Sequence, residues 1–362
     1  MKGKKIQLVI ATANLLPGGA ERVLSFLATE IDKEQFEVTI VVFGHERDVS
    51  YDLKGVNTVF FGRDRVMHGI FDFLKFLKRH KPDIVLTAIG HLNTLAAYAS
   101  WFFPKTKFVA REVNVLSVLD TFTDRKLNYL KLFTKNRFRF FDAIICQSDD
   151  MKEDLKKSYS FNYDKMVVIN NPITDGFKVK EQLPPMKPVA LITVGRLAKE
   201  KGYDRLLNVL SRFDLPFHYT MIGRGPEKEN IFRLIDDYKL GDKITHIEYT
   251  AEIPDYLRKS HIYLQGAYVE GFPNAVIESA SVGTPVLAFD APGGINEIIE
   301  DGINGYRVFS AEDYLKTLKS ICLDYTFVPE LVSASVNKKY NKDIIIQRFE
   351  ALFLKLCTVN DG

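Results

Sequence analysis

The sequence is poor in cysteine, and its few cysteines follow no recognisable pattern. Among 362 residues there are three, Cys146, Cys322 and Cys357, with no CxxC pair and with one thiol left over if any two were joined. This spacing indicates neither a disulfide framework nor a cysteine-rich metal site. We therefore expect the chain to work in a reducing, cytoplasmic environment.

Long apolar runs are also missing. No stretch supplies the ~18 consecutive apolar residues that a membrane-spanning helix needs. The basic and apolar start of the chain superficially resembles a secretion signal, but Gln7 and Asn14 interrupt it and no small-residue cleavage site follows. We interpret it as a first strand, and expect any membrane contact to be peripheral, on the inner face of the cell membrane.

A strong charge bias is absent as well. The formal net charge of +3 is too small to indicate nucleic acid binding by itself. A hydrophobic fraction of 46% with 26% charged residues and no low-complexity tract is typical of a globular protein with large cores. A chain of 362 residues exceeds one ordinary core, so we expect two domains.

Short apolar runs alternate with segments of helical period. Predicted strands are 6–11, 38–43, 84–87, 107–110, 143–147 and 167–169, then 190–194, 218–222, 244–248, 262–264 and 285–288. Predicted helices are 20–30, 71–79, 203–211, 228–238, 275–282 and 344–356. This rhythm predicts an α/β fold of two doubly wound, Rossmann-like domains with parallel sheets.

The domain boundary is predicted from turn-forming residues. Residues 171–187 contain three prolines and a glycine with few apolar side chains, which is typical of a linker. We predict a first domain over 1–174 and a second over 188–340. The remaining residues, 341–362, form a C-terminal helix that could return to pack on the first domain.

Three glycine-rich turns directly follow predicted strands. They are Gly18-Gly19, Gly195-Arg196 and Gly223-Arg224-Gly225. At the carboxyl ends of parallel strands, glycine lets a ligand approach the backbone and helix N-termini offer N–H groups to anions, so phosphate is the natural ligand. Arg196 and Lys201 beside the second turn could neutralise a diphosphate. The alternatives are that each turn is only a tight connection and that both cations are ordinary surface residues.

Two carboxylates are separated by seven residues in the second half. The segment reads Glu270-Gly271-Phe272-Pro273-Asn274-Ala275-Val276-Ile277-Glu278. Because Pro273 suits a first helical turn, we expect the N–H groups of residues 274–276 to be free for a phosphate or sugar oxygen. Glu278 would then lie in the second turn, where it could accept hydrogen bonds from a ribose diol or be a solvated or helix-capping acid.

These motifs together resemble the family-4 retaining GT-B glycosyltransferases. Glu270 and Glu278 match the family's E-x7-E pattern, and the wording Glu-Gly-Phe-Pro-Asn is typical of members that assemble surface polysaccharides and glycans. Further pieces occur in the family's order over nearly the whole chain: Gly18-Gly19-Ala20-Glu21-Arg22, Asn170-Asn171-Pro172, Gly195-Arg196, Lys201-Gly202, Gly283-Thr284-Pro285-Val286 and Pro292-Gly293-Gly294 with Glu297.

The resemblance implies a function and a set of site residues. It implies retaining transfer of a hexose or N-acetylhexosamine from a nucleotide diphosphate sugar, with UDP the expected nucleotide, to a glycan or polyprenyl-linked acceptor. The implied catalytic residues are Arg196, Lys201 and Glu270. The implied donor-binding residues are Gly19, Gly195, Arg196, Lys201, Gly271, Phe272, Pro273, Asn274, Ala275 and Glu278. No D-x-D triplet occurs and the histidines are scattered, so neither a metal nor another cofactor is expected.

One departure from the family pattern lies after the predicted strand 107–110. Many relatives have a histidine after the fifth strand, whereas this chain reads Ala110-Arg111-Glu112-Val113-Asn114. We predict Arg111, Glu112 and Asn114 as sugar or acceptor contacts. His91, just past a predicted strand, is a further candidate for such a contact, although a lone histidine is more often structural.

A basic segment covers residues 125–140. It holds six cations, no acids, and interleaved leucine and aromatic residues. Such a segment favours an amphipathic helix lying on an anionic membrane, and the alternative is a solvated face packed on the first domain. No nucleic-acid signature accompanies it, so nucleic acid is not an expected partner.

Two other classes of function fit parts of the pattern. A GT-B-like sugar-nucleotide 2-epimerase would convert the donor alone, without an acceptor. A non-catalytic nucleotide-sugar-binding protein would bind the donor and never turn it over. A dinucleotide dehydrogenase fits less well, because the glycine loops lack the required spacing.

Overall fold

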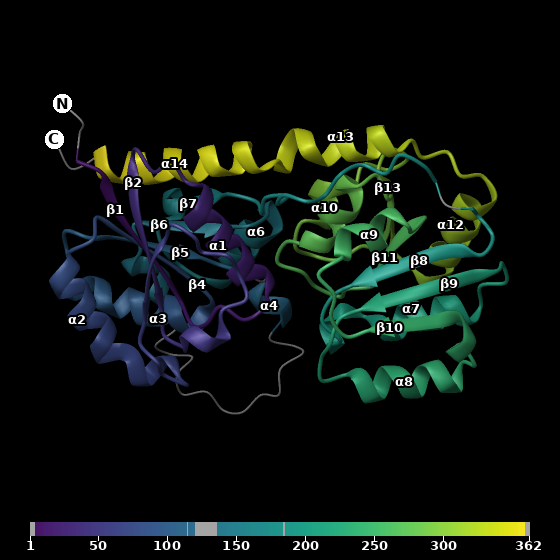
Figure 1. Cartoon of the computed structure of the whole chain (residues 1–362), viewed down its shortest axis with the longest axis horizontal. Coiled ribbons are helices and arrows are strands. Elements are labelled where there is room, and N and C mark those ends of the chain that lie inside the picture. Colours follow the sequence, from purple (N-terminus) through teal and green to yellow (C-terminus); the bar gives the residue numbers. More distant parts are fainter. Residues whose placement is uncertain (1–3, 114, 120–135, 184, 359–362) are drawn as a thin grey trace. The chain divides into compact units, whose positions relative to one another are not determined.

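The computed structural model describes residues 4–113, 115–119, 136–183 and 185–358. The chain forms two compact units. Unit 1 consists of Met1–Val113, Asp124–Pro172 and Lys342–Gly362, and unit 2 of Asn114–Thr123 and Ile173–Asn341. The C-terminal residues thus belong to the same unit as the N-terminal ones, which the colours of Figure 1 make easy to follow.

Unit 1 is built on a seven-stranded sheet whose neighbouring strands all pair in parallel. Its strands are β1 (Ile6–Thr12), β2 (Phe36–Val42), β3 (Asn57–Phe60), β4 (Ile84–Ala88), β5 (Lys107–Arg111), β6 (Ala143–Cys146) and β7 (Met166–Val168), in the order β3-β2-β1-β4-β5-β6-β7. Its helices include α1 (Gly19–Glu30), α2 (Ile70–His80), α3 (Gly90–Ala99), α6 (Asp149–Ser158) and α14 (Lys342–Thr358). The strand order reverses between β1 and β4.

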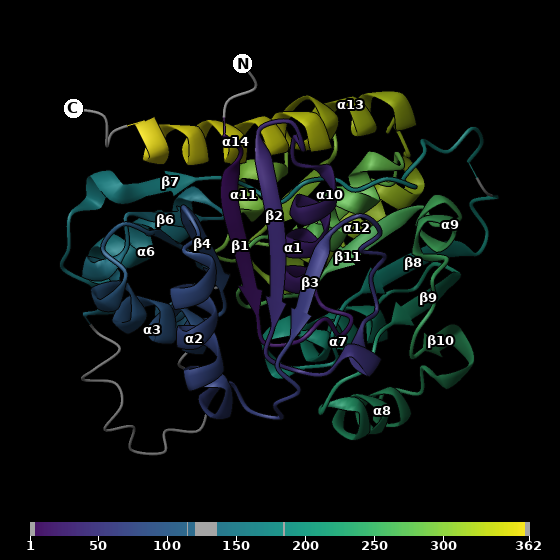
Figure 2. The same ribbon diagram turned by 60° about the vertical axis from the view of Figure 1, so that its left-hand side comes forward.

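The core of unit 1 needs the end of the chain. Ile345, Phe349 and Phe353 of α14 are buried among residues of the central strands, and the Phe353 ring meets Phe36 of β2 edge-on with centroids 6.1 Å apart. Figures 1 and 2 both show α14 running beside β1 and β2. The backbone N–H of Asp32 also donates to Glu350, 2.9 Å away. The last helix is therefore an integral layer of the first unit.

Unit 2 repeats the plan with a six-stranded parallel sheet. Its strands are β8 (Val189–Val194), β9 (Phe217–Ile222), β10 (Ile244–Ile247), β11 (Ile262–Gln265), β12 (Val286–Phe289) and β13 (Gly305–Val308), in the order β10-β9-β8-β11-β12-β13. Its helices are α4 (Leu116–Leu119), α7 (Tyr203–Ser211), α8 (Lys228–Asp237), α9 (Ile253–Arg258), α10 (Asn274–Ser281), α11 (Ile295–Ile298), α12 (Ala311–Leu323) and α13 (Pro329–Tyr340), as far as the chain is described. The order reverses between β8 and β11. The predicted α/β class with two doubly wound parallel sheets is confirmed.

The predicted linker is held on unit 2. The backbone N–H of Ile173 donates to the carbonyl of Tyr340, 2.8 Å away. Lys180 is buried, and its Nζ donates to the carbonyl of Ser260 at 2.6 Å. Desolvation lowers the pKa of Lys180 to about 7. Residues 173–183 are thus part of the second unit's structure.

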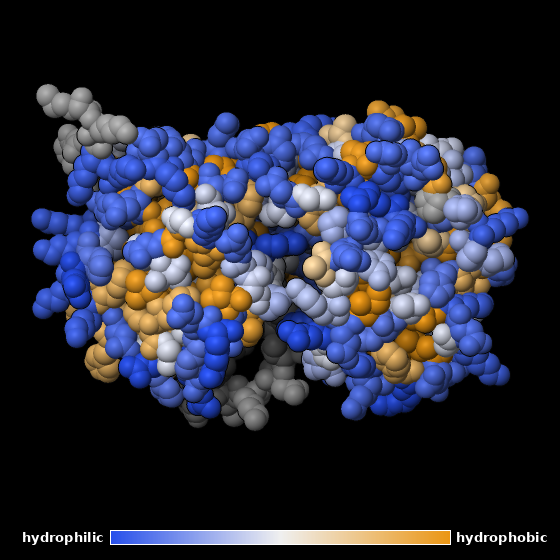
Figure 3. All heavy atoms as spheres, in the orientation of Figure 1, coloured by the Kyte–Doolittle hydropathy of each residue, from blue (hydrophilic) through white to orange (hydrophobic). Residues whose placement is uncertain are grey.

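The surface is mostly hydrophilic, with apolar patches on both units in the face that Figure 3 shows. Within the described part of the chain, no helix combines the length and apolar character needed to cross a bilayer.

Candidate functional site

The carboxyl ends of β8 and β11 meet where the strand order of unit 2 reverses, the place at which open α/β sheets bind ligands. The two loops touch through glycines. Gly202 has φ 61°, and a Cβ there would lie 1.8 Å from the carbonyl oxygen of Gly266. Arg205 donates to the carbonyls of Gly266 and Ala267, and its guanidinium lies 4.2 Å from the ring centroid of Tyr268. The loops are therefore locked together, and a side chain at position 202 would separate them.

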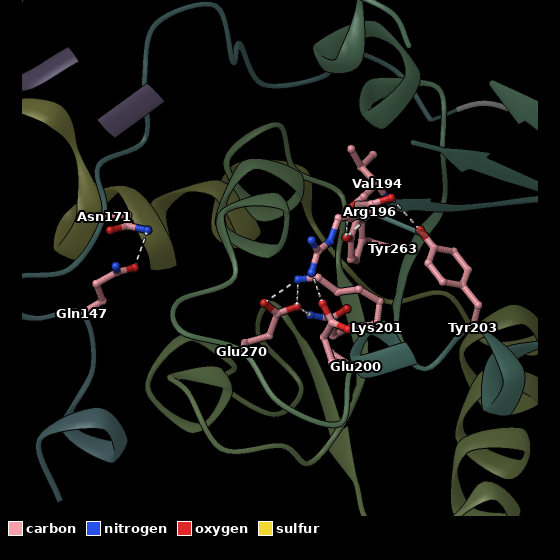
Figure 4. Close-up of polar contacts among 12 residues, drawn as sticks. Gln147, Asn171, Val194, Arg196, Glu200, Lys201, Tyr203, Tyr263 and Glu270 are labelled. Carbon is pink, nitrogen blue, oxygen red and sulfur yellow. Dashed lines mark hydrogen bonds and ion pairs between the residues drawn. The ribbon is translucent and has the colours of Figure 1, made fainter. Parts of the chain in front are cut away.

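This junction brings together Lys201 and Glu270, 69 residues apart in sequence. Lys201 Nζ lies 2.7 Å from both carboxylate oxygens of Glu270, as Figure 4 shows. Gln265 Nε2, at the end of β11, donates to Oε1 of the same carboxylate at 3.1 Å. The side chains of Lys201 and Glu270 are 26% and 10% exposed, so the pair is well packed but reachable.

Arg196 lies on the same loop system but is far more open. It forms an ion pair with Glu200, and its side chain is 64% exposed while that of Glu200 is 14% exposed. Burial acts to raise the pKa of Glu200, yet the hydrogen bond from Arg196 and further favourable interactions lower it overall. Glu200 therefore stays ionised and holds Arg196 in place, leaving much of the guanidinium accessible to an anion.

Two buried tyrosines hold the end of β8. Tyr203 donates its hydroxyl to the carbonyl of Gly195 at 3.0 Å, and Tyr263 donates to the carbonyl of Val194 at 2.9 Å. Desolvation raises the pKa of both phenols well above the usual value. Both therefore remain neutral donors, and they fix the turn that begins at Gly195.

The helix with the second carboxylate differs in one respect from expectation. Pro273 is the residue before α10 and not in its first turn, and the N–H of Val276 donates to the Pro273 carbonyl at 3.0 Å. The expectation that the Val276 N–H is free is wrong, because the first turn of the helix is closed by this bond to the residue three positions earlier. Glu278 lies in the second turn and is only 3% exposed, which contradicts the alternative of a solvated acid.

The remaining predicted donor residues take distinct places. Gly271, Phe272 and Pro273 are buried, and Asn274 and Ala275 open α10 half-buried. Their burial keeps the segment between the two glutamates in one conformation. In unit 1, Gly19 is the exposed first residue of α1, and the preceding Gly18 is held by the Tyr51 hydroxyl, which accepts from its N–H and donates to its carbonyl.

Arg111 ends β5 of unit 1 and is completely buried. Its Nη2 donates to Asn171 Oδ1, while Nε and Nη1 have no hydrogen-bond partner within the described chain. Desolvation lowers its pKa to about 10, and the nearby charge of Glu21 opposes that shift. The guanidinium is therefore cationic at neutral pH. Burial raises the pKa of Glu21, and its backbone hydrogen bond and Arg111 partly counter this.

Glu112 lies inside unit 1 with 1% of its surface exposed. Its Oε1 accepts from Asn93 Nδ2 at 2.8 Å and pairs with Arg137 Nη2 at 3.4 Å. Gln147 Nε2 donates to its carbonyl at 2.8 Å. The structure therefore gives this carboxylate internal partners instead of the accessible position expected of a sugar contact.

The remaining residues predicted to contact the sugar, acceptor or membrane in the first domain are His91, Asn114 and the basic segment 125–140. His91 is the second residue of α3 and its side chain is exposed, although neighbouring protein atoms lower its pKa by desolvation. Asn114 lies outside the described residues, as do residues 125–135 of the basic segment. Of its described end, Arg137 is turned inward to Glu112 and Arg139 is exposed.

Several polar residues of these clusters were not singled out from the sequence. They are Asn93, Arg137 and Gln147 in unit 1 and Glu200, Gln265 and Arg205 in unit 2. Gln147 and Gln265 stand at or directly after the carboxyl end of a predicted strand, so the strand-end rule that found the glycine turns could have found both. Among the described residues, no group of three or more His, Cys, Asp or Glu side chains is placed to hold a metal ion.

Comparison with known proteins connects these features to a family. The family model described as Glycosyltransferase Family 4 matches residues 17–176, and the one described as Glycosyl transferases group 1 matches residues 175–338. Together the two models span both units and nearly the whole chain.

Curated relatives are similar over much of the sequence. The chain is 26% identical over 285 residues to the UDP-N-acetylglucosamine–peptide N-acetylglucosaminyltransferase GtfA subunit of Streptococcus pneumoniae, covering 74% of this chain and 55% of that protein. It is 25% identical over 320 residues to the N-acetylgalactosamine-N,N'-diacetylbacillosaminyl-diphospho-undecaprenol 4-alpha-N-acetylgalactosaminyltransferase of Campylobacter jejuni, covering 83% and 86%. The chain thus spans only about half of the pneumococcal relative.

Solved structures share the fold over almost the full length. The lipopolysaccharide outer core galactosyltransferase WaaB superimposes with a TM-score of 0.77 at 18% identity, covering 96% of this chain and 99% of that one. Anabaena HepE in complex with UDP-glucose gives 0.81 at 16% identity, covering 97% and 100%. The chain therefore belongs to the family-4 glycosyltransferases and has their GT-B fold.

Proposed function

We propose that this glycosyltransferase moves a hexose or N-acetylhexosamine, with retention of configuration, from a UDP-sugar to a glycan or lipid-linked acceptor in surface polysaccharide biosynthesis. The observation that carries the proposal is the Lys201–Glu270 pair beside exposed Arg196 at the strand-order reversal of unit 2. A carboxylate for sugar hydroxyls and two cations for a diphosphate are the groups this reaction needs.

The relatives support the substrate classes. The pneumococcal and Campylobacter relatives are both named as N-acetylhexosaminyltransferases, and the second is named for an acceptor carried on diphospho-undecaprenol. A further relative, 23% identical over 297 residues, is named as an amylovoran biosynthesis glycosyltransferase of Erwinia amylovora. These names favour an N-acetylhexosamine donor and a lipid-linked glycan acceptor.

In the proposed reaction, the acceptor hydroxyl attacks the anomeric carbon on the face that the nucleotide leaves. The new glycosidic bond forms as the bond to the β-phosphate oxygen breaks, and the hydroxyl proton passes to that oxygen. Arg196 and Lys201 stabilise the negative charge on the departing diphosphate, which makes a metal ion unnecessary. An ammonium carries three N–H groups, so Lys201 can contact both oxygens of Glu270 and still donate to a phosphate.

Glu270 and Glu278 would recognise the two ends of the donor. Glu270 is held by Lys201 and Gln265 and accepts hydrogen bonds from the transferred sugar. Glu278, rigid and buried in α10, accepts from the ribose hydroxyls. Because both carboxylates are positioned before the donor arrives, little ordering is needed on binding.

A thermal-shift screen against UDP, GDP, ADP and their sugar conjugates, with and without EDTA, tests the proposal. A ligand that binds only the folded state raises the melting temperature, so a rise with UDP and UDP-sugars that EDTA does not change is expected. A rise that EDTA abolishes would refute metal independence, and no response to any nucleotide would refute the site.

Turnover distinguishes the proposal from its alternatives. With a radiolabelled UDP-N-acetylhexosamine and a polyprenyl diphosphate-linked acceptor, label is expected in the lipid fraction together with free UDP. Conversion of the donor to an isomer without acceptor would indicate the epimerase instead, and binding without any turnover would indicate a non-catalytic protein.

A further inference from the structure

Unit 1 carries a cluster of aromatic side chains at the end of α3. Trp101 and Phe102, in the short 3-10 turn Ser100–Phe102, are each 72% exposed, and Tyr98 one turn earlier is 38% exposed. The Trp101 ring meets Phe140 edge-on at 5.5 Å between centroids, and Tyr98 lies 6.0 Å from the same ring. We call Tyr98, Trp101, Phe102 and Phe140 the aromatic patch.

Folding of the chain alone does not account for exposed aromatic side chains that lie next to one another. Single exposed apolar residues are common on protein surfaces. A group of neighbouring exposed aromatic side chains instead indicates a surface that binds a protein, a membrane or a ligand. Tryptophan is well suited to a membrane–water interface, because its ring is apolar while its indole N–H can stay hydrated.

The two stretches of chain that form the patch carry charges of one sign. The stretches 98–107 and 136–141, which form it, contain four cations and no aspartate or glutamate. Two of these cations are neutralised internally, because Lys107 pairs with Asp142 at 3.5 Å and Arg137 with Glu112 at 3.4 Å. Lys105 and Arg139 are exposed. Arg139 Nε donates to a backbone carbonyl, and no ion pair of either cation occurs among the described residues.

We propose that the aromatic patch docks on an anionic lipid bilayer, with Trp101 and Phe102 entering the headgroup region and Lys105 and Arg139 binding lipid phosphates. The inference deepens the proposed function, since a lipid-linked acceptor would be presented at such a surface. A second copy of the chain fits less well, because a two-fold interface would bring the same cations face to face.

The chain contains a built-in probe, since Trp101 is its only tryptophan. Adding vesicles of phosphatidylcholine and phosphatidylglycerol in equal parts should shift its emission to shorter wavelength, and brominated lipids should quench it. The shift should weaken with added salt and with pure phosphatidylcholine vesicles, because screening reduces attraction to the headgroups. Sedimentation with vesicles while the emission stays unchanged would overturn the proposal, and so would a blue shift that depends on protein concentration without lipid.

Matched variants test the same surface independently. Trp101→Ser with Phe102→Ser should lower partitioning onto the anionic vesicles by at least about tenfold, because two aromatic side chains lose their apolar contact. The control, Phe309→Ser with Leu323→Ser, removes side chains of unit 2 that are 72% and 74% exposed and should leave partitioning unchanged. Equal partitioning of the two variants would overturn the proposal.

Charge-reversal variants test whether the binding to vesicles is electrostatic, and turnover assays test whether it is independent of catalysis. Lys105→Glu with Arg139→Glu should reduce binding to the anionic vesicles far more than to neutral ones, and an equal loss on both would refute the electrostatic part. Nucleotide-sugar hydrolysis without lipid should be the same in the aromatic variant and the wild type. The vesicle assays contain no substrate, so their failure is independent of a failure of the proposed reaction.

Discussion

The polar clusters at the strand ends of the two units differ in how far their charged side chains are exposed to solvent. In unit 1, Arg111, Glu112 and Arg137 are buried, and the carboxylate is closed off by internal partners. In unit 2, Arg196 is mostly exposed and Lys201 is partly so. The same sheet architecture therefore supports a closed network that rigidifies strand ends and an open one that can take up a ligand.

The largest effect is a loss of stability, expected when the buried network around Glu112 in unit 1 is disrupted. Replacing Glu112 by alanine leaves the Arg137 charge buried and removes one of the two acceptors of Asn93 Nδ2, so unit 1 should lose about 3–5 kcal/mol of stability. Urea unfolding measures the loss, with Glu153→Ala on the exposed face of α6 as a control. A change below ~1 kcal/mol would show that the network is not a closed structural unit.

Disrupting the more exposed cluster of unit 2, which contains Arg196, Lys201 and Glu270, should lower turnover and not stability. Lys201→Ala removes a cation from the departing diphosphate and releases Glu270, so kcat should fall by roughly 10²–10³ with little change in melting temperature. Steady-state kinetics test this, with Lys199→Ala on the same loop as the matched control. Equal rates for the two variants would remove Lys201 from the catalytic group.

A smaller effect is expected on nucleotide affinity. Glu278→Ala should weaken UDP binding about ten- to hundredfold, because about 1.5–3 kcal/mol is typical for hydrogen bonds to a charged group. Isothermal titration calorimetry compares it with Glu330→Ala, an exposed acid at the start of α13. Unchanged affinity, with an unchanged melting temperature, would separate Glu278 from the ribose.

The last effect is a pH dependence of stability, which arises at a buried contact within unit 2. Lys180 has a folded pKa of about 7 against an ordinary 10.5, so between these values the unfolded state binds more protons. Stability should therefore rise with pH from 7 towards 10, by at most about 1.4 kcal/mol per pH unit. Below that window both states bind the proton, so the cost of the buried ammonium is constant and Lys180 adds no pH dependence.

Lys180→Met should flatten this rise, whereas Lys178→Met, at an exposed position of the same segment, should keep it. Chemical denaturation at a series of pH values provides the comparison. Identical slopes in both variants would show that the Lys180 ammonium is not held in a desolvated place.

The sequence predicts most strands but misses two edge strands and several helices, among them α6, α12 and α13. β1, β4 and β8 are mostly apolar, whereas β3 and β13, at sheet edges, are short and mixed, so hydrophobic patterning passes over them. The family motifs name Lys201 and Glu270 separately, but their direct contact depends on loops 69 residues apart. Likewise, nothing local indicates that Arg111 is buried, because its partner Asn171 comes from the end of the domain.

The position of α14 has a consequence for biosynthesis. Its apolar residues complete the core of unit 1, yet they are translated about 170 residues after Pro172, the last earlier residue of that unit. At a typical ~5–20 residues per second, the first unit waits roughly 10–30 s on the ribosome with an unfilled apolar surface. Folding of the N-terminal unit is therefore tied to the synthesis of α14, and a nascent chain stopped before Lys342 would present that surface to chaperones.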